Sequence, residues 1–137
     1  MATISYLEYS DRDHKYAKGV LTLGFYDPCG RFCQQSVEKR FKHFIELNGS
    51  PGDLKFLHTH NLGRLYDKVC ELSGSVPNQE YRGWLSRLTD YYFDANYPKE
   101  INIELTEEMA IEALDITGKI NIWVDSLNPP PDHVSPE

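Results

Sequence analysis

Hydrophobic side chains recur every three or four positions along most of this chain, which is the spacing of an amphipathic helix. The most regular stretch covers residues 29–47. Its apolar and small positions are Cys29, Phe32, Cys33, Ser36, Val37, Phe41, Phe44 and Ile45. Asp27 suits the N-cap of this helix, and Pro28 suits its first turn, where a missing N–H costs nothing. The sequence Asn-Gly-Ser-Pro-Gly at residues 48–52 predicts its end.

The same spacing predicts further helices on both sides of this stretch. Three of them cover residues 62–72, residues 81–98 and residues 109–127. The last one follows a capping signal, because Thr106 lies three residues before Met109 and acidic residues fill the first turn.

The N-terminal part of the chain has a weaker helical pattern. A first helix is expected over residues 11–26, but its apolar positions are sparse and Gly19 and Gly24 interrupt it. Alternation with a period of two is confined to residues 100–105, a stretch too short to build a sheet. We therefore expect an all-α fold, an up-and-down bundle of about five helices.

The length of 137 residues corresponds to one domain. We expect a single helical domain over residues 1–127 and a flexible, proline-rich tail over residues 128–137. No apolar run approaches the roughly 20 residues that a membrane span needs, and the polar N-terminus has no leader-like apolar region. Three cysteines cannot all pair with one another, which favours a reducing compartment, so we expect a cytoplasmic protein.

Charge is distributed unevenly along the chain, whose formal net charge is −7. Residues 29–68 carry seven Lys and Arg against four Asp and Glu, whereas residues 69–137 carry four against thirteen. The overall acidity argues against a general coat for duplex DNA, which is usually basic. It does not exclude a phosphate-bearing ligand at the basic stretch, and the acidic half could face a basic partner or the basic stretch of a second copy.

The common catalytic and cofactor motifs are missing from the sequence, which has no P-loop, no Gly-x-Ser-x-Gly and no dinucleotide-binding glycine motif. His58 and His60 have no cysteine or glutamate nearby at ligand spacing, so local hydrogen bonding is favoured over a metal site. Cys29 and Cys33 lie one turn apart on an apolar face, where core packing is favoured over zinc binding. We expect neither a metal nor a cofactor.

One charged residue, Arg40, falls in the apolar arc of its helix, between Ser36 and Phe44. A guanidinium buried there would need a carboxylate or several carbonyl partners. The side chain could extend to the edge of the bundle. Alternatively, this face could open onto a cleft or a partner chain in which Arg40 meets an anion.

Four segments of the sequence resemble segments of one protein family. Residues 32–44, FCQQSVEKRFKHF, resemble the QQ-A-x-E-K-A-x-K-A-L helix of HEPN domains, and residues 59–65, THNLGRL, resemble the T-H-D-L-x-x-L entry to a further helix. Residues 91–98, YYFDANYP, are similar to the family's Y-Y-I-x-x-R-Y-P segment, and residues 106–110, TEEMA, to its T-x-E-E-A helix start. Their order and spacing agree over about residues 10–127. The resemblance implies the all-α HEPN bundle.

The resemblance also implies a range of functions. Many HEPN proteins are small prokaryotic proteins that work beside a minimal nucleotidyltransferase, often as a toxin–antitoxin pair. Others are RNases whose active site is an Arg, four to six residues and then a His, usually completed across a dimer. None of the five histidines in this chain has an Arg five to seven residues before it, so no catalytic residue is carried over.

We therefore expect a binding protein, a homodimer whose ligand is a nucleotide or RNA or whose partner is a minimal nucleotidyltransferase. The alternative is a metal-independent RNase with a non-standard active site, such as His60 with Arg64 or Lys39. The candidate ligand-binding residues lie along the second predicted helix, at the entry of the third and at the end of the fourth: Gln35, Glu38, Lys39, Arg40, Lys42, His60, Asn96 and Tyr97.

Several of these candidates have a structural explanation of equal weight. Glu38 and Lys42 form an i,i+4 pair that contributes only a few tenths of a kcal/mol, and a solvent-exposed polar face would explain both. Asn96 stands where HEPN relatives often carry an Arg. Arg40 and His43 stand where the family usually has small residues, and they could restore positive charge on the same face.

Overall fold

The computed structural model describes residues 4–96 and 104–127, and these residues form helices without any strand. The helices are α1 (Tyr6–Thr22), α2 (Tyr26–Asn48), the 3-10 helix η1 (Pro51–His58), α3 (Leu62–Ser73), α4 (Gln79–Asn96) and α5 (Glu107–Leu127). The expected all-α helical fold is confirmed. The predicted tail, residues 128–137, and most of the alternating stretch at residues 100–105 lie outside the described residues.

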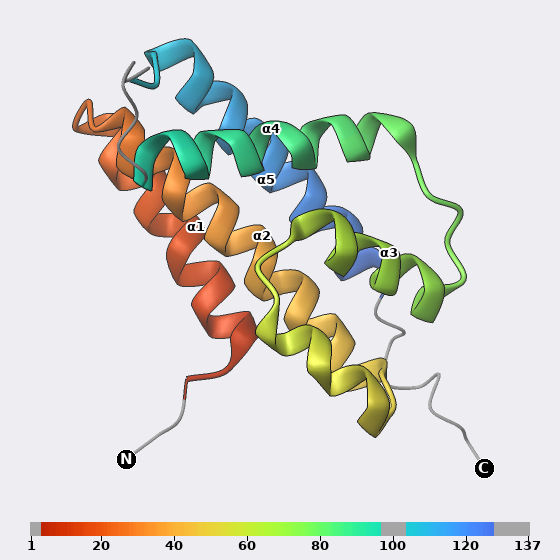
Figure 1. The fold of residues 1–137 in the computed structure, drawn as a ribbon. Helices are drawn as coiled ribbons and strands as arrows, with labels where there is room; N and C mark the ends of the chain where they lie inside the picture. Colours follow the sequence, from red (N-terminus) through yellow and green to blue (C-terminus); the bar gives the residue numbers. More distant parts are fainter. Residues whose placement is uncertain (1–3, 97–103, 128–137) are drawn as a thin grey trace.

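Helix α2 is the centre of the fold, since it contacts every other helix. Figure 1 shows α1 and α2 side by side as an antiparallel pair, with α4 crossing at a wide angle in front of α5. Helix α2 can fill this place because its buried side chains are not confined to one stripe. They include the apolar core residues Cys29, Cys33, Val37, Phe41, Phe44 and Ile45 and also several polar ones.

The core packing predicted for the two cysteines is confirmed, since Cys29 and Cys33 are both fully buried. They belong to one cluster that unites the five α-helices, with Ala17 from α1, Tyr66 from α3 and Leu88 from α4 among its members. None of the helices described is long and apolar enough to cross a membrane.

The start of α2 differs from the sequence-based prediction. The N-cap position belongs to Phe25, and Asp27 lies inside the first turn, so the predicted N-cap at Asp27 is wrong. The carboxylate of Asp27 instead accepts a hydrogen bond from the backbone N–H of Leu105, at 2.9 Å. It therefore fixes the chain just before α5, a contact that spans 78 residues and leaves no local signal.

Helix α1 begins five residues before the predicted start. Ser5 and Glu8 form a capping box that initiates it, which the sparse apolar pattern had hidden. Gly19 lies inside the helix, whereas Gly24 follows it with a φ of +83°, a conformation that favours glycine. The predicted end near residue 26 is therefore also wrong.

The short helix η1 was not predicted. Ser50-Pro51-Gly52 indicates a break, but Ser50 and Asp53 form a second capping box that starts a new turn directly after α2. The predicted limits of α3 and α5 are confirmed to within two residues, with Asn61 and Thr106 each accepting from a first-turn N–H.

Candidate functional site

Two candidate residues on α2, Glu38 and Lys42, lie in the interior instead of on a solvated face. Their side chains are 3% and 4% exposed, and Lys42 Nζ lies 2.8 Å from Glu38 Oε2. The predicted i,i+4 pair is thus confirmed, but the explanation as a solvent-exposed face is wrong. The reason is tertiary, because α1 and η1 both pack against α2 and His60 contacts Glu38.

Glu38 is the centre of a small polar network. Its Oε1 accepts from Gln34 Nε2 at 3.2 Å, and its Oε2 lies 2.9 Å from His60 Nδ1. Burial on its own would raise the pKa of the Glu38 carboxyl, but Lys42 and His60 outweigh burial and hold this pKa below its usual value. Glu38 is therefore a carboxylate at neutral pH, buried and stabilised by its partners.

His60 covers this network from outside, with 76% of its side chain exposed. In the neutral imidazole, a carboxylate beside Nδ1 favours the tautomer in which Nδ1 carries the hydrogen and Nε2 is the acceptor. A buried carboxylate that orients an exposed imidazole is an arrangement that can bind a polar group or move a proton.

Two exposed cations lie close to His60 in the sequence and share one aromatic ring. Lys55 Nζ is 5.7 Å from the centroid of the Phe56 ring, and the guanidinium carbon of Arg64 is 5.6 Å from it. In the part of the chain that the structure describes, neither side chain has a carboxylate partner. Lys68, at 5.0 Å from the same ring, differs because it pairs with Asp53.

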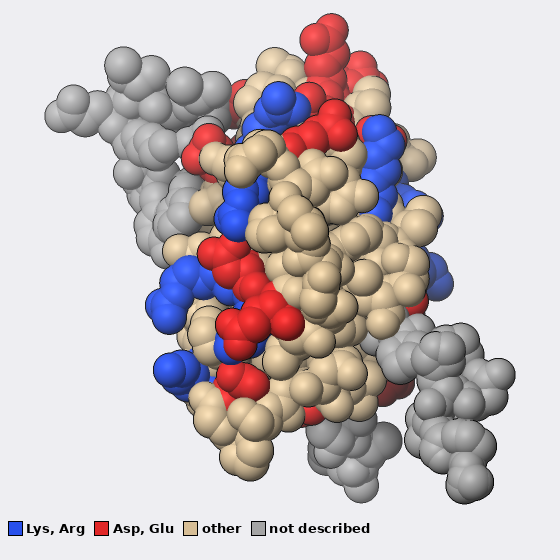
Figure 2. All heavy atoms as spheres, turned by 90° about the vertical axis from the view of Figure 1, so that its right-hand side faces the viewer, with Lys and Arg blue, Asp and Glu red and all other residues tan. Residues whose placement is uncertain are grey.

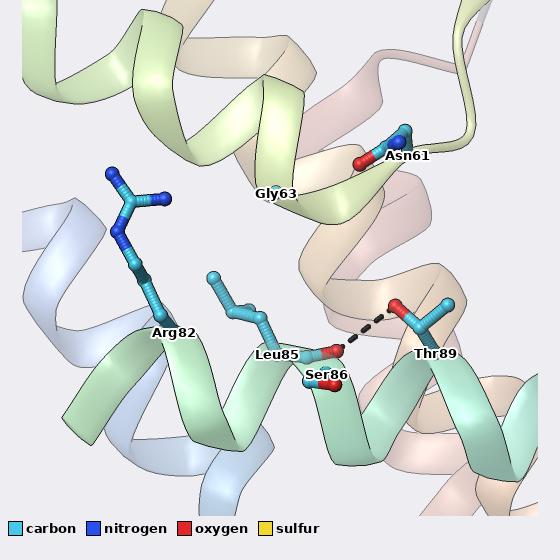
Figure 3. A pocket seen from close by; sticks show the side chains of 6 residues that line it. All are labelled: Asn61, Gly63, Arg82, Leu85, Ser86 and Thr89. Atoms are coloured by element: carbon cyan, nitrogen blue, oxygen red, sulfur yellow. Dashed lines mark hydrogen bonds between the residues drawn. The ribbon is translucent and has the colours of Figure 1, made fainter. Parts of the chain in front are cut away.

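A cavity of about 290 Å³ lies between the start of α3 and helix α4. It is lined by Asn61, Gly63, Arg82, Leu85, Ser86 and Thr89. Figure 3 shows Arg82 and Leu85 reaching from α4 toward α3, while Thr89 donates back to the Leu85 carbonyl at 2.9 Å. His60, whose imidazole is exposed, directly precedes Asn61, which lines the cavity.

The basic character of residues 29–68 is reduced by pairing in the fold. Figure 2 shows Lys and Arg next to Asp and Glu on one face, without a large patch of one sign. Arg40, Lys42 and Lys68 all have carboxylate partners. Lys55 and Arg64, which pair with no carboxylate in the described part of the chain, are a local feature beside α3, and the sequence-based prediction did not include Lys55.

Arg40 lies in a different part of the molecule, where α1, α2 and α5 meet. It is buried, its Nε and Nη2 donate to the Asp125 carboxylate, and its Nη1 donates to Asp11. The carboxylate that a buried Arg requires is thus supplied from within the chain. Burial tends to lower the pKa of Arg40, but Asp125 and Asp11 outweigh this and raise it.

The structure therefore brings together only part of the predicted set. Glu38, Lys42 and His60 form one network, while Arg40 lies apart. Gln35 and Lys39 are half-buried on α2. Asn96 is the last residue of α4, and Tyr97 lies outside the described residues.

Metal-ligand groups can be assessed over the described ranges, 4–96 and 104–127. There, no three His, Cys, Asp or Glu side chains lie close enough together to hold a metal ion. The pair His58 and His60 accordingly has no third ligand in that part of the chain.

Comparisons with known proteins agree on one family. A family model described as "HEPN domain" matches residues 5–127. The crystal structure of TT1696 from Thermus thermophilus is similar, with a TM-score of 0.77 and 25% identity over 90% of this chain and 95% of that one. The structure of ST0689, an archaeal HEPN homologue, has a TM-score of 0.61 and 20% identity over 88% and 93%. A search of curated proteins gave no significant match.

Proposed function

The chain belongs to the HEPN family, and on this premise we propose that it is a binding protein for a nucleotide or another phosphate-bearing ligand. The proposed binding site is the junction of η1, α3 and α4. The observation that carries the proposal is the pair of exposed cations, Lys55 and Arg64, that flank Phe56 and have no carboxylate partner among residues 4–96 and 104–127.

The chemistry of this junction suits a phosphate. The first turn of α3 offers backbone N–H groups and the positive end of the helix dipole, which stabilise an anion. Arg64 lies in that turn and adds a planar guanidinium, which can bind two phosphate oxygens at once. His60, oriented by Glu38, adds a further polar group.

The adjacent cavity supports a ligand larger than phosphate. Its volume of about 290 Å³ is at the lower limit of small-molecule sites, which span about 300–1,000 Å³. Leu85 gives it an apolar wall, and Ser86 and Arg82 give it polar groups. A ring such as a nucleobase would fit this combination.

Calorimetry with ATP, GTP and a short single-stranded RNA tests the proposal. We expect Arg64→Ala and Lys55→Ala each to weaken binding about tenfold, the loss of roughly 1.4 kcal/mol for one charge-assisted contact. The matched control is Arg87→Ala, since Arg87 is an exposed Arg of α4 that pairs with Glu112. Absence of binding by the unmodified protein, or equal binding by all variants, would overturn the proposal.

We further propose that the chain acts beside a minimal nucleotidyltransferase, in a module of the toxin–antitoxin type. The support is family membership alone. Co-expression with the product of the neighbouring reading frame would be followed by size-exclusion chromatography. Co-elution is expected, and separate elution of a folded nucleotidyltransferase and this protein would contradict it.

A second candidate function is metal-independent RNA cleavage, favoured by the contact between Glu38 and His60 Nδ1. An imidazole fixed in this way can act as a general base, and Arg64 could stabilise charge on a phosphate. Cleavage of mixed RNA in EDTA would be compared for His60→Ala and His58→Ala. Loss with the first variant only would support this activity, and no cleavage by the unmodified protein would refute it.

A further inference from the structure

A second cavity lies where α1 begins and α2 ends, and we call it the tyrosine pocket. Figure 1 shows that these two helix ends lie at the same end of the antiparallel pair. The volume of the pocket is about 550 Å³, which falls within the range of about 300–1,000 Å³ for small-molecule sites. The described residues that line it are Ile4, Ser5, Tyr6 and Tyr9 from the start of α1 and Glu46 from the end of α2.

The start of α1 gives this pocket a fixed wall. The backbone N–H of Ser5 donates to Glu8 Oε1 at 3.0 Å, and that of Glu8 donates to Ser5 Oγ at 3.1 Å, so a closed capping box holds the first turn. Tyr6 and Tyr9 are three residues apart on α1, and a helix places residues with this separation on one face. Both residues are half-buried. The two rings therefore form a wall that exists before any ligand binds.

Glu46 is the charged residue of this pocket. It is exposed, and its carboxylate accepts no hydrogen bond and joins no ion pair within residues 4–96 and 104–127. Its charge acts on the neighbouring phenol, because burial and then Glu46 and Glu38 raise the pKa of the Tyr6 hydroxyl. The surroundings of that hydroxyl are therefore electrically negative, and they favour a cation as ligand.

The tyrosine rings add to this preference, because the face of an aromatic ring attracts a cation. Tyr9 already has such a contact, since the guanidinium carbon of Arg12, one turn further along α1, lies 4.7 Å from the centroid of its ring. Tyr6 has no cation over its ring among the described side chains. Its ring and the Glu46 carboxylate thus line the same pocket, and no described lining residue supplies a positive charge.

The apolar part of the lining indicates that the cation is organic. Ile4 is 39% exposed at the pocket, and its side chain would gain nothing from a hydrated metal ion. A hard cation such as Ca²⁺ also requires six or more oxygen ligands, and Glu46 supplies one carboxylate. A neutral ligand would leave the charge of Glu46 unmatched. A cation with a hydrocarbon chain satisfies both parts of the lining.

We propose that the tyrosine pocket binds a primary alkylammonium ion. The ammonium group lies between the Glu46 carboxylate and the Tyr6 ring, and the hydrocarbon chain packs against Ile4. A free aliphatic amine and a lysine side chain of another protein both present this group. The proposal is independent of the phosphate site, because the two cavities share no described lining residue and their ligands have opposite charge.

An NMR titration of the full chain tests the proposal, with butylammonium chloride as the ligand and butanol as its uncharged counterpart. We expect butylammonium to shift the signals of Tyr6, Tyr9 and Glu46, and butanol to bind about tenfold more weakly, the effect of one charge-assisted contact. Glu46→Gln should weaken butylammonium binding to the same extent.

The matched control for Glu46→Gln is Glu80→Gln, because Glu80 is an exposed glutamate in the first turn of α4 and does not line the pocket. This variant should bind butylammonium like the unmodified protein. Absence of butylammonium binding, equal binding of butanol, or equal effects of the two variants would overturn the proposal.

Two substitutions of Tyr6 separate the ring from the hydroxyl. Tyr6→Phe keeps a ring and should leave the affinity for butylammonium nearly unchanged. Tyr6→Leu should weaken it about twofold to fivefold, the range for an exposed cation–π contact. The NMR spectrum of each variant verifies that it is folded. Equal affinity of the two variants would show that the ammonium group does not lie over the ring.

Two further probes identify the source of the amine. Putrescine represents a free amine, and the methylamide of acetyl-lysine represents a protein side chain. Both should bind more weakly to Glu46→Gln, and the probe with the higher affinity for the unmodified protein indicates the source. Binding of neither probe would contradict the proposal. None of the probes carries a phosphate, so a negative result here is distinguishable from a failure of the nucleotide titrations.

Discussion

Arg40 on α2 and Asp125 on α5 form a two-pronged ion pair across the bundle. Arg40 Nε and Nη2 donate to the two carboxylate oxygens of Asp125 at 3.0 and 2.7 Å. The third nitrogen, Nη1, donates to Asp11 and to the hydroxyl of Ser10 on α1. One guanidinium therefore links the three helices at a point where the sequence alone shows a charge within an apolar arc.

The first prediction concerns this link. Arg40→Ala should lower the free energy of unfolding by about 2 kcal/mol, a typical loss for hydrogen bonds to charged groups. The loss is not larger because the side chains of Asp11 and Asp125 are 65% and 47% exposed and can return to water. Arg40→Lys should restore only part of it, since lysine lacks the two-pronged geometry.

Urea denaturation measures this effect, and ATP binding by the folded variant completes the test. If Arg40 acts only as a structural link, the variant binds ATP like the unmodified protein below the denaturation transition. Loss of ATP binding by well-folded Arg40→Ala would instead return Arg40 to the ligand site.

The second prediction concerns the buried pair on α2. Lys42→Met should destabilise the protein by about 3–5 kcal/mol, because it leaves the Glu38 charge buried with fewer partners. The double variant Glu38→Gln with Lys42→Met should recover much of that loss, since no charge then remains in the interior. Thermal melting of the unmodified protein, Lys42→Met and the double variant measures these changes. A double variant with a melting temperature no higher than that of Lys42→Met would contradict the prediction.

The same carboxylate predicts a dependence on acid. The pKa of Glu38 in the folded chain lies below its ordinary 4.5, so its contribution to stability is present above about pH 4.5. It is lost as the pH falls through the folded-state pKa. Glu38→Gln should therefore flatten the decline in unfolding free energy between pH 4.5 and 3, and an unchanged decline would contradict this.

Two half-buried histidines predict a further decline at milder pH. Burial, followed by Lys18 for His14 and by Arg40 for His43, lowers both pKa values below 6.5. The unfolded chain therefore binds more protons as the pH falls below about 6.5, and stability decreases. Burial raises the pKa of the Asp13 carboxyl above its usual value. This group alone would therefore increase the stability of the fold as the pH falls further, in contrast to the two histidines.

Urea denaturation at pH 7.5, 6.5 and 5.5 measures this decline. The double variant His14→Gln with His43→Gln should lose less stability across this range than the unmodified protein. Parallel curves for the two proteins would show that these histidines do not cause the decline.

A matched pair of glycine substitutions tests the packing of α2. A Cβ at Gly30 would lie 2.5 Å from Leu105 Cδ1 and 3.4 Å from Tyr91 Cβ. Gly30→Ala should therefore destabilise the fold by about 1–3 kcal/mol, the usual cost of overpacking. A Cβ at Gly83 on α4 would have no atom of the described residues within 4 Å, so Gly83→Ala should stabilise by about 0.5–1 kcal/mol. If both substitutions raise the melting temperature, or both lower it, the predicted difference in packing between Gly30 and Gly83 is contradicted.

The sequence by itself determined the helical class, the family and the features that depend on neighbours along the chain. The apolar spacing of α2, the N-cap at Asn61 and the pair of Glu38 with Lys42 are local, because a helix brings residues three and four apart together. The end of α2 at Asn48 was also predicted, because the Asn-Gly-Ser-Pro-Gly stretch at residues 48–52 is a local signal. Capping boxes at Ser5 and Ser50 were also local, but sparse apolar residues and a proline obscured them.

Tertiary structure decided burial and the choice of partners. Glu38 and Lys42 are interior because other helices, α1 and η1 among them, pack against α2, and His60, some 20 residues further along, contacts Glu38. Arg40 meets Asp125 across 85 positions, and periodicity contains no information on such a distance. Helical spacing fixes which residues share a face, whereas burial depends on which other helix covers that face, and only the packed bundle determines this.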